Sequence, residues 1–566
     1  MKINYTHPTD LTPKLFTIIK EGYSKQTFIS DLISGILIGI VALPLAIAFG
    51  IASGVKPEQG IFSAIIAGIV VSMFSGSRVQ VSGPTGAFIV IIYGIVQQYG
   101  YDGLAIATIL AGIFLVILGL FRFGILLRFI PYSLTIGFTS GIAVIIFSSQ
   151  VNDFLGLNIR SVPADFVDKW VVFYQNLNSF NYYTLIIGLA SLIIIFGWQR
   201  FNLKISGSLI ALILATLIVQ IFQLPVDTIG SKFGNVPNSL PSPSFPNLSW
   251  AVITKMFSPA FTIAILAAIE SLLSAAVADG MTGTRHRSNM ELVAQGLGNI
   301  VSPIFSGIPV TGAIARTAAN IKNGGKTPIA GIVHSIVLVF IILFFGSYAE
   351  MIPLSALSAI LIYTAYKMSE WHSFIKTLKA PLSDRVILIN TFLLTIFIDL
   401  TVAIEVGLVL AALTFIKKMS DVTEARLLTE SMRAAEEGND SETIAANEIP
   451  KGVEIFEVYG TLFFGAVDQF RETIRQFEKA PKLIILQTQH LLVIDGSGLK
   501  ALEDLFEQLQ KDKTILFVSG IHKQPMFELI RSGLFDKIKE KNFFGNLEEA
   551  LQAARIVISS NEVRIL

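Results

Sequence analysis

The chain has 566 residues, of which 52% are hydrophobic and only 15% charged, and its formal net charge is +1. The near-neutral charge argues against a nucleic-acid partner, and the lack of cysteine excludes disulfides, thiolate catalysis and Cys-ligated zinc. The six histidines are scattered, so we predict neither a metal site nor a cofactor. This composition is typical of a polytopic membrane protein.

Residues 1–29 contain no apolar signal-peptide core, and we predict that they form a cytoplasmic N-terminal segment. Residues 30–419 are rich in apolar stretches and are predicted to form a transmembrane domain of about 14 helical segments. The predicted segments are 30–54, 57–75, 84–99, 103–121, 130–151, 182–198, 206–223, 258–280, 291–306, 312–322, 327–348, 353–366, 385–399 and 401–416. Several are shorter than the ~20 residues that a helix needs to cross the lipid, including 84–99 and 312–322.

The distribution of Lys and Arg predicts the orientation of these segments. Basic residues are much more frequent in the loops that lie inside if the N-terminus is cytoplasmic. Because the number of crossings is even, the C-terminus is then cytoplasmic as well. The predicted segments divide into two halves of seven. Because each half crosses the membrane an odd number of times, the second half is inverted relative to the first. We therefore predict a multi-pass cell-membrane protein with a 7+7 inverted repeat.

The C-terminal part has the pattern of a soluble domain. Residues 420–450 are polar and acidic and are predicted to be a linker, and 451–566 are predicted to form a small cytoplasmic α/β domain. Three predicted strands, Val453–Tyr459, Leu483–Gln487 and Thr514–Val518, alternate with segments whose apolar residues recur at helical spacing.

Two matching breaks interrupt the membrane region, Ser82–Ala87 and Gly307–Ala313. Each contains Pro and Gly where a spanning helix should continue, and such breaks survive only where protein or a polar cavity surrounds them. Each is followed by a half-helix whose N-terminus offers free N–H groups and a partial positive charge to an anion. The predicted anion-binding residues are Gly83, Pro84, Thr85, Gly86, Ala87, Thr311, Gly312, Ala313, Ile314 and Arg316. A pair of packing kinks is the alternative.

Two charged residues at membrane depth are functional candidates. Arg316 lies about one turn into the second half-helix and is predicted to add positive potential to the anion site. Glu270 lies near the middle of the eighth segment and is predicted to carry a coupling proton, whereas Ser271 and Ser274 offer oxygens that could instead help to hold Na⁺. The alternatives are an Arg316 that extends to the cytoplasmic face and a structural Glu270–Arg316 pair.

These residues resemble the sulfate permease (SulP) family of anion transporters and exchangers. The resemblance rests on Glu270–Gly280, Thr282–Asn289, Glu291–Asn299 and Gly307–Thr317, together with Ala42–Gly50 near the N-terminus. It implies fourteen helices in core and gate domains, a substrate site between the third and tenth segments, elevator-like motion and a homodimer. It also implies that residues 451–566 form a STAS domain, which can contact cytoplasmic regulators.

The resemblance further implies secondary active transport of a small inorganic or carboxylate anion. Bicarbonate-transporting relatives can carry Asp at the position of Glu270 and lack an Arg at that of Arg316, so we expect proton-coupled symport or exchange (antiport) of sulfate or a related oxyanion. The alternatives are a sodium-coupled bicarbonate transporter, a dicarboxylate transporter and an uncoupled anion channel. An enzyme is not expected.

The segment Ile494–Leu499 resembles the loop-to-helix motif of STAS domains. In stand-alone members of that fold, Ser or Thr directly after the Asp accepts phosphate. Gly496 occupies that position here, which argues against a phosphorylation switch, and Ser497 is predicted to cap the helix.

Overall fold

The computed structural model describes residues 11–124, 131–157, 159, 162–163, 165–198, 200, 206–234, 238–246, 250–398, 400–427, 449–475 and 481–559. The chain forms two compact units, Met1–Ala411 and Ala412–Leu566, which are described separately.

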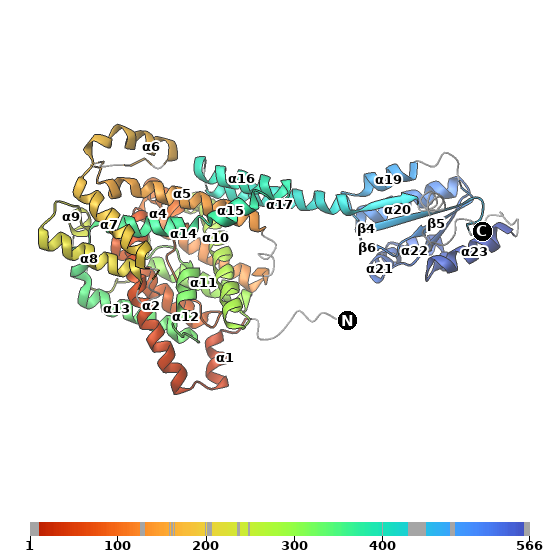
Figure 1. Cartoon of the computed structure of the whole chain (residues 1–566). Coiled ribbons are helices and arrows are strands. Elements are labelled where there is room, and N and C mark those ends of the chain that lie inside the picture. Colours follow the sequence, from red (N-terminus) through yellow and green to blue (C-terminus); the bar gives the residue numbers. More distant parts are fainter. Residues whose placement is uncertain are drawn as a thin grey trace. The chain divides into compact units, whose positions relative to one another are not determined.

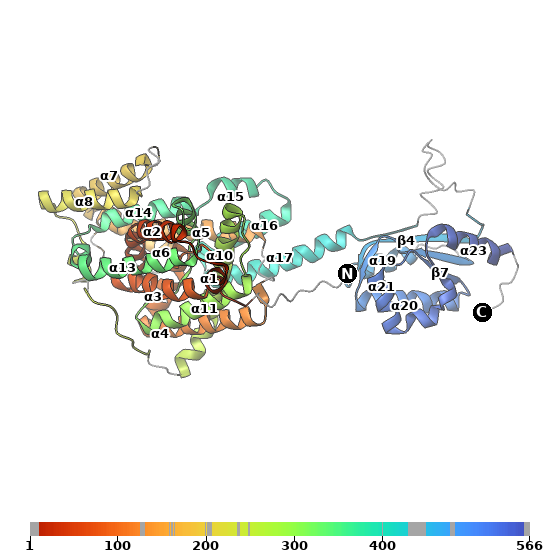
Figure 2. The ribbon, with the colours of Figure 1, turned by 90° about the horizontal axis from the view of Figure 1, so that it is seen from below.

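The first unit is almost entirely helical (Figures 1 and 2). Its elements are α1 (Lys14–Glu21), α2 (Lys25–Ala52), α3 (Pro57–Phe74), β1 (Ser82–Gly83), η1 (Gly86–Phe88), α4 (Ile89–Leu120), α5 (Tyr132–Leu155), α6 (Phe166–Gln175), η3 (Leu177–Ser179), α7 (Tyr182–Trp198), α8 (Gly207–Phe222), α9 (Ile229–Phe233), α10 (Trp250–Thr282), α11 (Ser288–Ile304), β2 (Thr311–Gly312), α12 (Ile314–Lys322), α13 (Pro328–Ala349), α14 (Leu354–Met368), α15 (Trp371–Thr377), α16 (Leu382–Phe397) and α17 (Leu400–Val422), whose end extends into the second unit.

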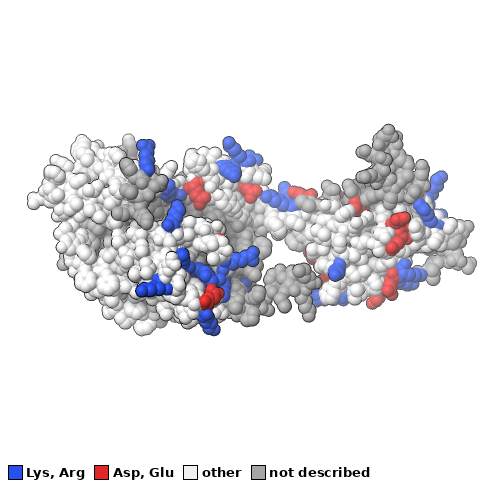
Figure 3. Space-filling model, turned by 60° about the horizontal axis from the view of Figure 1, so that its bottom comes forward, with Lys and Arg blue, Asp and Glu red and all other residues white. Residues whose placement is uncertain are grey.

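Six helical stretches in the described part of the chain are long and apolar enough to cross a membrane alone: α2, α3, η1 with α4, α5, α10 and α13. The stretch Gly86–Leu120 contains two of the predicted segments. Gly100 divides it, because this glycine has a φ of 68° and a ψ of −173°, which are not helical. In Figure 3, broad areas of this unit carry no charged side chain, as a surface in contact with lipid requires.

The helices of this unit pack in two groups. In one group, α4 packs against α10 and α11, and α2 packs against α3 and α13; in the other, α5 packs against α14 and α16, and α7 packs against α8 and α14. Small residues allow the closest approaches. A Cβ on Gly112 would lie 2.6 Å from the carbonyl oxygen of Gly296, and a Cβ on Gly296 would lie equally close to that of Gly112.

The second unit is an α/β domain with one mixed sheet. Its strands are β3 (Glu424–Leu427), β4 (Val453–Leu462), β5 (Leu483–Gln487), β6 (Leu491–Ile494), β7 (Ile515–Ser519) and β8 (Phe543–Phe544). The order is β3-β4-β5-β7-β8, with β6 also paired to β4, and only β3 is antiparallel to its neighbour. Its other helical segments are α19 (Val467–Arg475), α20 (Gly496–Lys511), α21 (Lys523–Ser532), α22 (Leu534–Ile538), η6 (Glu540–Asn542) and α23 (Leu547–Ser559).

Two local features differ from expectation. The first residues of the predicted linker form the last turn of α17, and the next form β3. Residues 428–448 lie outside the described residues. The prediction that Ser497 caps α20 is wrong, because Asp495 is the N-cap and its Oδ1 accepts a hydrogen bond of 2.8 Å from the Gly498 N–H. Ser497 lies two residues after this cap, inside the first turn of α20.

Candidate functional site

The two interrupted segments lie side by side in the first unit. β1 and β2 form an antiparallel pair in which Ser82 lies opposite Gly312 and Gly83 opposite Thr311. The pair continues into the second half-helix, since the Ala313 N–H donates to the Val81 carbonyl over 2.9 Å. The helices begin slightly later than predicted, at Gly86 for η1 and at Ile314 for α12. Residues distant in sequence thus lie together at the starts of two helices.

Side chains from neighbouring helices satisfy the extended backbone at the second break. Asn299 of α11 binds both backbone polar groups of one residue: its Oδ1 accepts from the Val310 N–H over 2.9 Å, and its Nδ2 donates to the Val310 carbonyl over 2.8 Å. Ser63 of α3 accepts from the Ile308 N–H over 2.6 Å, and the Tyr101 hydroxyl donates to the Gly307 carbonyl over 2.8 Å. These bonds replace the helix ladder that lipid-buried backbone otherwise needs.

The first break is held in the same way, but by the second half of the chain. Thr317 of α12 accepts a bond of 3.1 Å from the Val81 N–H, and Asn320 donates one of 2.8 Å to the Val79 carbonyl. These supporting residues were not predicted from the sequence. In the sequence they are recognisable only as polar residues that recur at helical spacing within apolar helices. This spacing predicts that they are buried, but it does not predict their hydrogen-bond partners.

We predict that Asn299→Leu destabilises the protein. The change leaves both polar groups of Val310 unpaired in the interior, at a cost of about 1–3 kcal/mol for each group. Thermal unfolding of purified protein in detergent should therefore begin at a clearly lower temperature than for the wild type. Asn390→Leu is the matched control, because its Nδ2 donates to the carbonyl of Val386 on an exposed turn of α16 and to no other residue that the structure describes. Equal unfolding temperatures for the two variants would contradict this supporting role.

Arg316 is buried, with 4% of its surface exposed, and lies against β1. Its Nη2 donates to the Pro84 carbonyl, whereas its Nη1 has no hydrogen-bond partner among the described residues. The guanidinium therefore lies inside the unit beside the first break, and does not extend to the protein surface as it would if it reached the cytoplasmic face. A Cβ on Gly83 would lie 2.2 Å from Nη1, so only glycine leaves room for this cation beside the strand.

Glu270 of α10 lies at the other side of the first break. Its Oε2 accepts a hydrogen bond of 2.9 Å from Thr85 Oγ1, and no ion pair joins it to Arg316 among the described residues. The structural Glu270–Arg316 pair is therefore not formed. Thr85 precedes η1 but makes no side-chain cap, because its hydroxyl is bonded to the carboxylate instead. The carboxylate is thus connected to the residue from which the half-helix begins.

Ser271 and Ser274 are fully buried and already bonded. Ser271 Oγ donates to the Ala267 carbonyl and lies 3.1 Å from Thr311 Oγ1, which itself donates to Ala267 over 3.0 Å. Ser274 Oγ donates to Thr317 Oγ1 over 3.2 Å. These bonds join α10 to β2 and α12.

The remaining predicted residues surround the breaks. Gly86 and Ala87 are buried, and a Cβ on Gly86 would lie 2.8 Å from Met368 Sδ at the end of α14. A Cβ on Gly312 would lie 1.7 Å from Gln80 Nε2, which belongs to a buried amide with no hydrogen-bond partner in the part of the chain that the structure describes. Ala313 is buried, whereas Ile314 is 42% exposed.

Sequence comparison places this site in a known family. Residues 28–391 match the sulfate permease family, and residues 445–550 match the STAS domain. The chain belongs to the sulfate permease family. It is therefore a multi-pass membrane protein and an anion transporter rather than an enzyme, and its second unit contains a STAS domain.

Relatives of known name match nearly the whole chain. "Putative sulfate transporter YvdB" of Bacillus subtilis (strain 168) is 39% identical over 531 residues, which cover 94% of this chain and 98% of that protein. "Bicarbonate transporter BicA" of Picosynechococcus sp. is 29% identical over 547 residues, 93% of this chain and 94% of the relative.

Two solved structures show the fold. The structure of SLC26A9 superposes with a TM-score of 0.85 and 20% identity, covering 98% of this chain and 94% of that one. The transmembrane domain of a cyanobacterial bicarbonate transporter, BicA, superposes with a TM-score of 0.60 and 28% identity, covering 69% of this chain and 98% of that domain.

Proposed function

We propose that this protein is a secondary active transporter of sulfate or a related oxyanion, coupled to protons. The observation that carries the proposal is the unpartnered Nη1 of Arg316, a buried cationic donor beside β1 and two helix starts. Guanidinium groups suit oxyanions because several N–H donors point in fixed directions. The helix starts add free N–H groups and partial positive charge at the same place.

The proposal covers the residues around both breaks. The anion would bind among Gly83, Pro84, Thr85, Gly86, Ala87, Thr311, Gly312, Ala313, Ile314 and Arg316. Residues 30–419 would form the transport domain and 451–566 the STAS domain, while elevator-type alternating access and a homodimer follow from the family resemblance.

Glu270 is proposed to carry the coupling proton. Its bond to Thr85 connects its protonation state to the start of η1. Ionised, the carboxylate repels an anion bound nearby, and protonation removes that repulsion. The hydroxyls of Ser271 and Ser274 donate their hydrogens within the protein, so their oxygen atoms could still bind a cation, and Na⁺ is the alternative coupling ion that the uptake experiment distinguishes.

Uptake by proteoliposomes tests the proposal. We expect labelled sulfate to accumulate when the outside is more acidic than the lumen, to stop accumulating when a protonophore removes the gradient, and to be indifferent to Na⁺. Unlabelled bicarbonate, chloride and succinate are added as competitors, and protein-free liposomes give the background. Sodium-dependent bicarbonate uptake without sulfate uptake would favour the function named for BicA. Gradient-independent flux would favour a channel.

A further inference from the structure

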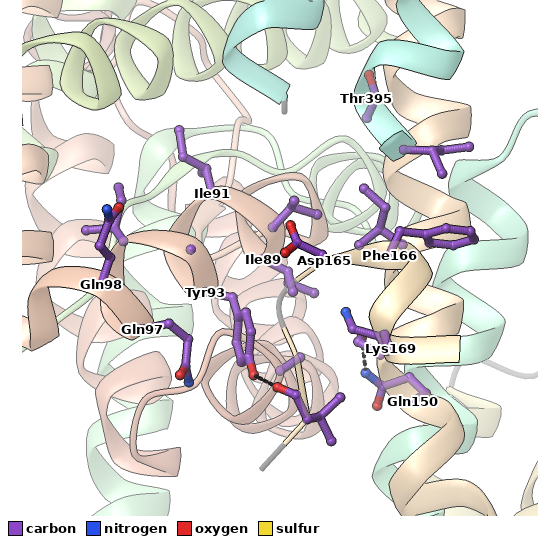
Figure 4. Close-up of a pocket in the computed structure, with 18 of the residues that line it drawn as sticks. Ile89, Ile91, Tyr93, Gln97, Gln98, Gln150, Asp165, Phe166, Lys169 and Thr395 are labelled. Atoms are coloured by element: carbon purple, nitrogen blue, oxygen red, sulfur yellow. Dashed lines mark hydrogen bonds between the residues drawn. The ribbon is translucent and has the colours of Figure 1, made fainter. Parts of the chain in front are cut away.

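A cavity of about 780 Å³, whose lining includes none of the anion-binding residues proposed at the breaks, lies between the first part of α4 and helices α5 and α6 (Figure 4). Its polar wall includes Tyr93, Gln97, Gln98, Gln150 and Asn152. The positive-inside orientation places α6, which follows the fifth predicted segment, on the outer side of the membrane. The cavity therefore faces the side opposite the cytoplasmic N-terminus.

Lys169 of α6 supplies an unpaired charge to this cavity. Only 4% of its surface is exposed, and in the described ranges its Nζ has neither a hydrogen bond nor an ion pair. Nζ instead lies 5.9 Å from the centroid of the Tyr93 ring, and Figure 4 shows both side chains pointing toward the space between α4 and α6. Burial lowers the pKa of the ammonium group, although Asp165 opposes that shift. A buried ammonium without a counter-ion favours the binding of an anion.

Three further charged residues line the cavity: Asp153, Asp165 and Lys232. Lys232 is neutralised by Asp153, since their Nζ and Oδ1 atoms lie 2.8 Å apart. Asp165 also lines the cavity, but it forms no ion pair with Lys169 among the described residues. The side-chain amides of Gln97 and Gln98 can donate further hydrogen bonds to oxygen atoms of an anion, whereas the hydroxyls of Tyr93, Ser149 and Thr395 already donate to backbone carbonyls.

The cavity reaches the helix that begins at the first break. Ile89 and Ile91 line it, and Ile89 directly follows η1. We propose that this cavity is an outer anion site, in which Lys169 holds the oxyanion before it passes to the site at the breaks. This inference rests on the proposed function for its substrate and adds a second binding site with its own residues.

Transport measured from one side at a time tests the site. In oriented vesicles, Lys169→Met should raise the KM for sulfate presented to the outer face by roughly tenfold, as expected for the loss of one charged hydrogen bond. The maximal rate and the KM from the cytoplasmic face should stay near wild type, and Lys169→Arg should restore the outer KM. Asp165→Asn should lower the KM for sulfate presented to the outer face, because a carboxylate that repels the anion is removed. Lys255→Met, an exposed outer lysine of α10, is the matched control.

A direct binding measurement separates this inference from the proposed function. Trp170 follows Lys169, and three further tryptophans can be replaced by Phe to make it the only one in the full-length chain. Sulfate titration should change its fluorescence, Lys169→Met should abolish the response, and Arg316→Ala should retain it. A response that survives Lys169→Met, or an outer KM unchanged by that substitution, would overturn the outer site. Absence of sulfate uptake with a normal Trp170 response would instead contradict only the transport proposal.

Discussion

Replacing Arg316 with Ala is expected to weaken sulfate binding by roughly 10- to 150-fold, the range that corresponds to losing one charged hydrogen bond of about 1.5–3 kcal/mol. The loss arises because Nη1 is the buried cationic donor without a protein partner at the junction of β1 and β2. Equilibrium binding of labelled sulfate to purified protein measures it directly. Transport should fall in parallel at low sulfate and recover in part at high sulfate.

Arg316 also has a structural contact, because its Nη2 donates to the Pro84 carbonyl. The measurement must therefore distinguish the loss of the positive charge from the loss of the hydrogen bond to the Pro84 carbonyl. Arg316→Lys keeps the charge but loses the planar fork, and we expect it to bind sulfate more weakly than the wild type and more tightly than Arg316→Ala. Arg316→Gln keeps a donor toward Pro84 without the charge. If Arg316→Gln binds sulfate like the wild type, the residue supports the strand and does not bind the anion.

The position of the two breaks, around which the candidate site lies, could be predicted from the sequence because its cause is local. Pro and Gly interrupt two apolar segments, and a charged residue at membrane depth is costly enough to be conspicuous, as with Glu270 and Arg316. The actual pairing could not be predicted. That Gly83 lies opposite Thr311, and that Glu270 contacts Thr85 rather than Arg316, depends on the packing of three helices from distant parts of the chain.

Other features were hidden for different physical reasons. Asn299 and Thr317 are ordinary polar residues in sequence, and their role comes from the unpaired backbone groups that they face. Lys169 lies in a loop between predicted segments, where a lysine is unremarkable until burial isolates its charge. In the second unit, short apolar runs that alternate with segments of helical periodicity revealed β4, β5 and β7, whereas β3 lies in a polar stretch whose strand character depends on pairing with β4.

Replacing Glu270 with Gln is expected to abolish the dependence of sulfate accumulation on the proton gradient while leaving exchange of sulfate across the membrane. The amide oxygen can still accept the bond from Thr85, so the first half-helix keeps its start, but the side chain can no longer gain or lose a proton. Uptake into proteoliposomes with an imposed pH difference, and exchange with equal sulfate on both sides, measure the two properties separately.

The sign of the pH effect follows from the proposed role. If the carboxyl must be protonated for the anion to bind, the apparent affinity of the wild type rises as the pH falls, by at most about tenfold per pH unit for one proton. Glu270→Gln resembles the protonated form permanently, so its affinity should be high and nearly independent of pH. A Glu270→Gln protein that still accumulates sulfate only under a proton gradient would assign the coupling proton to another group.

The same variant also tests why coupling is needed at all. Moving one net negative charge inward against 100 mV costs about 2.3 kcal/mol, so an anion carried alone is driven outward by an inside-negative membrane potential. In the wild type, the proton on Glu270 cancels one charge of the anion during the crossing. Without a titrating carboxyl that compensation is lost. We therefore expect net uptake by Glu270→Gln to become more sensitive to an imposed inside-negative potential than uptake by the wild type, and a valinomycin-clamped K⁺ gradient provides that potential.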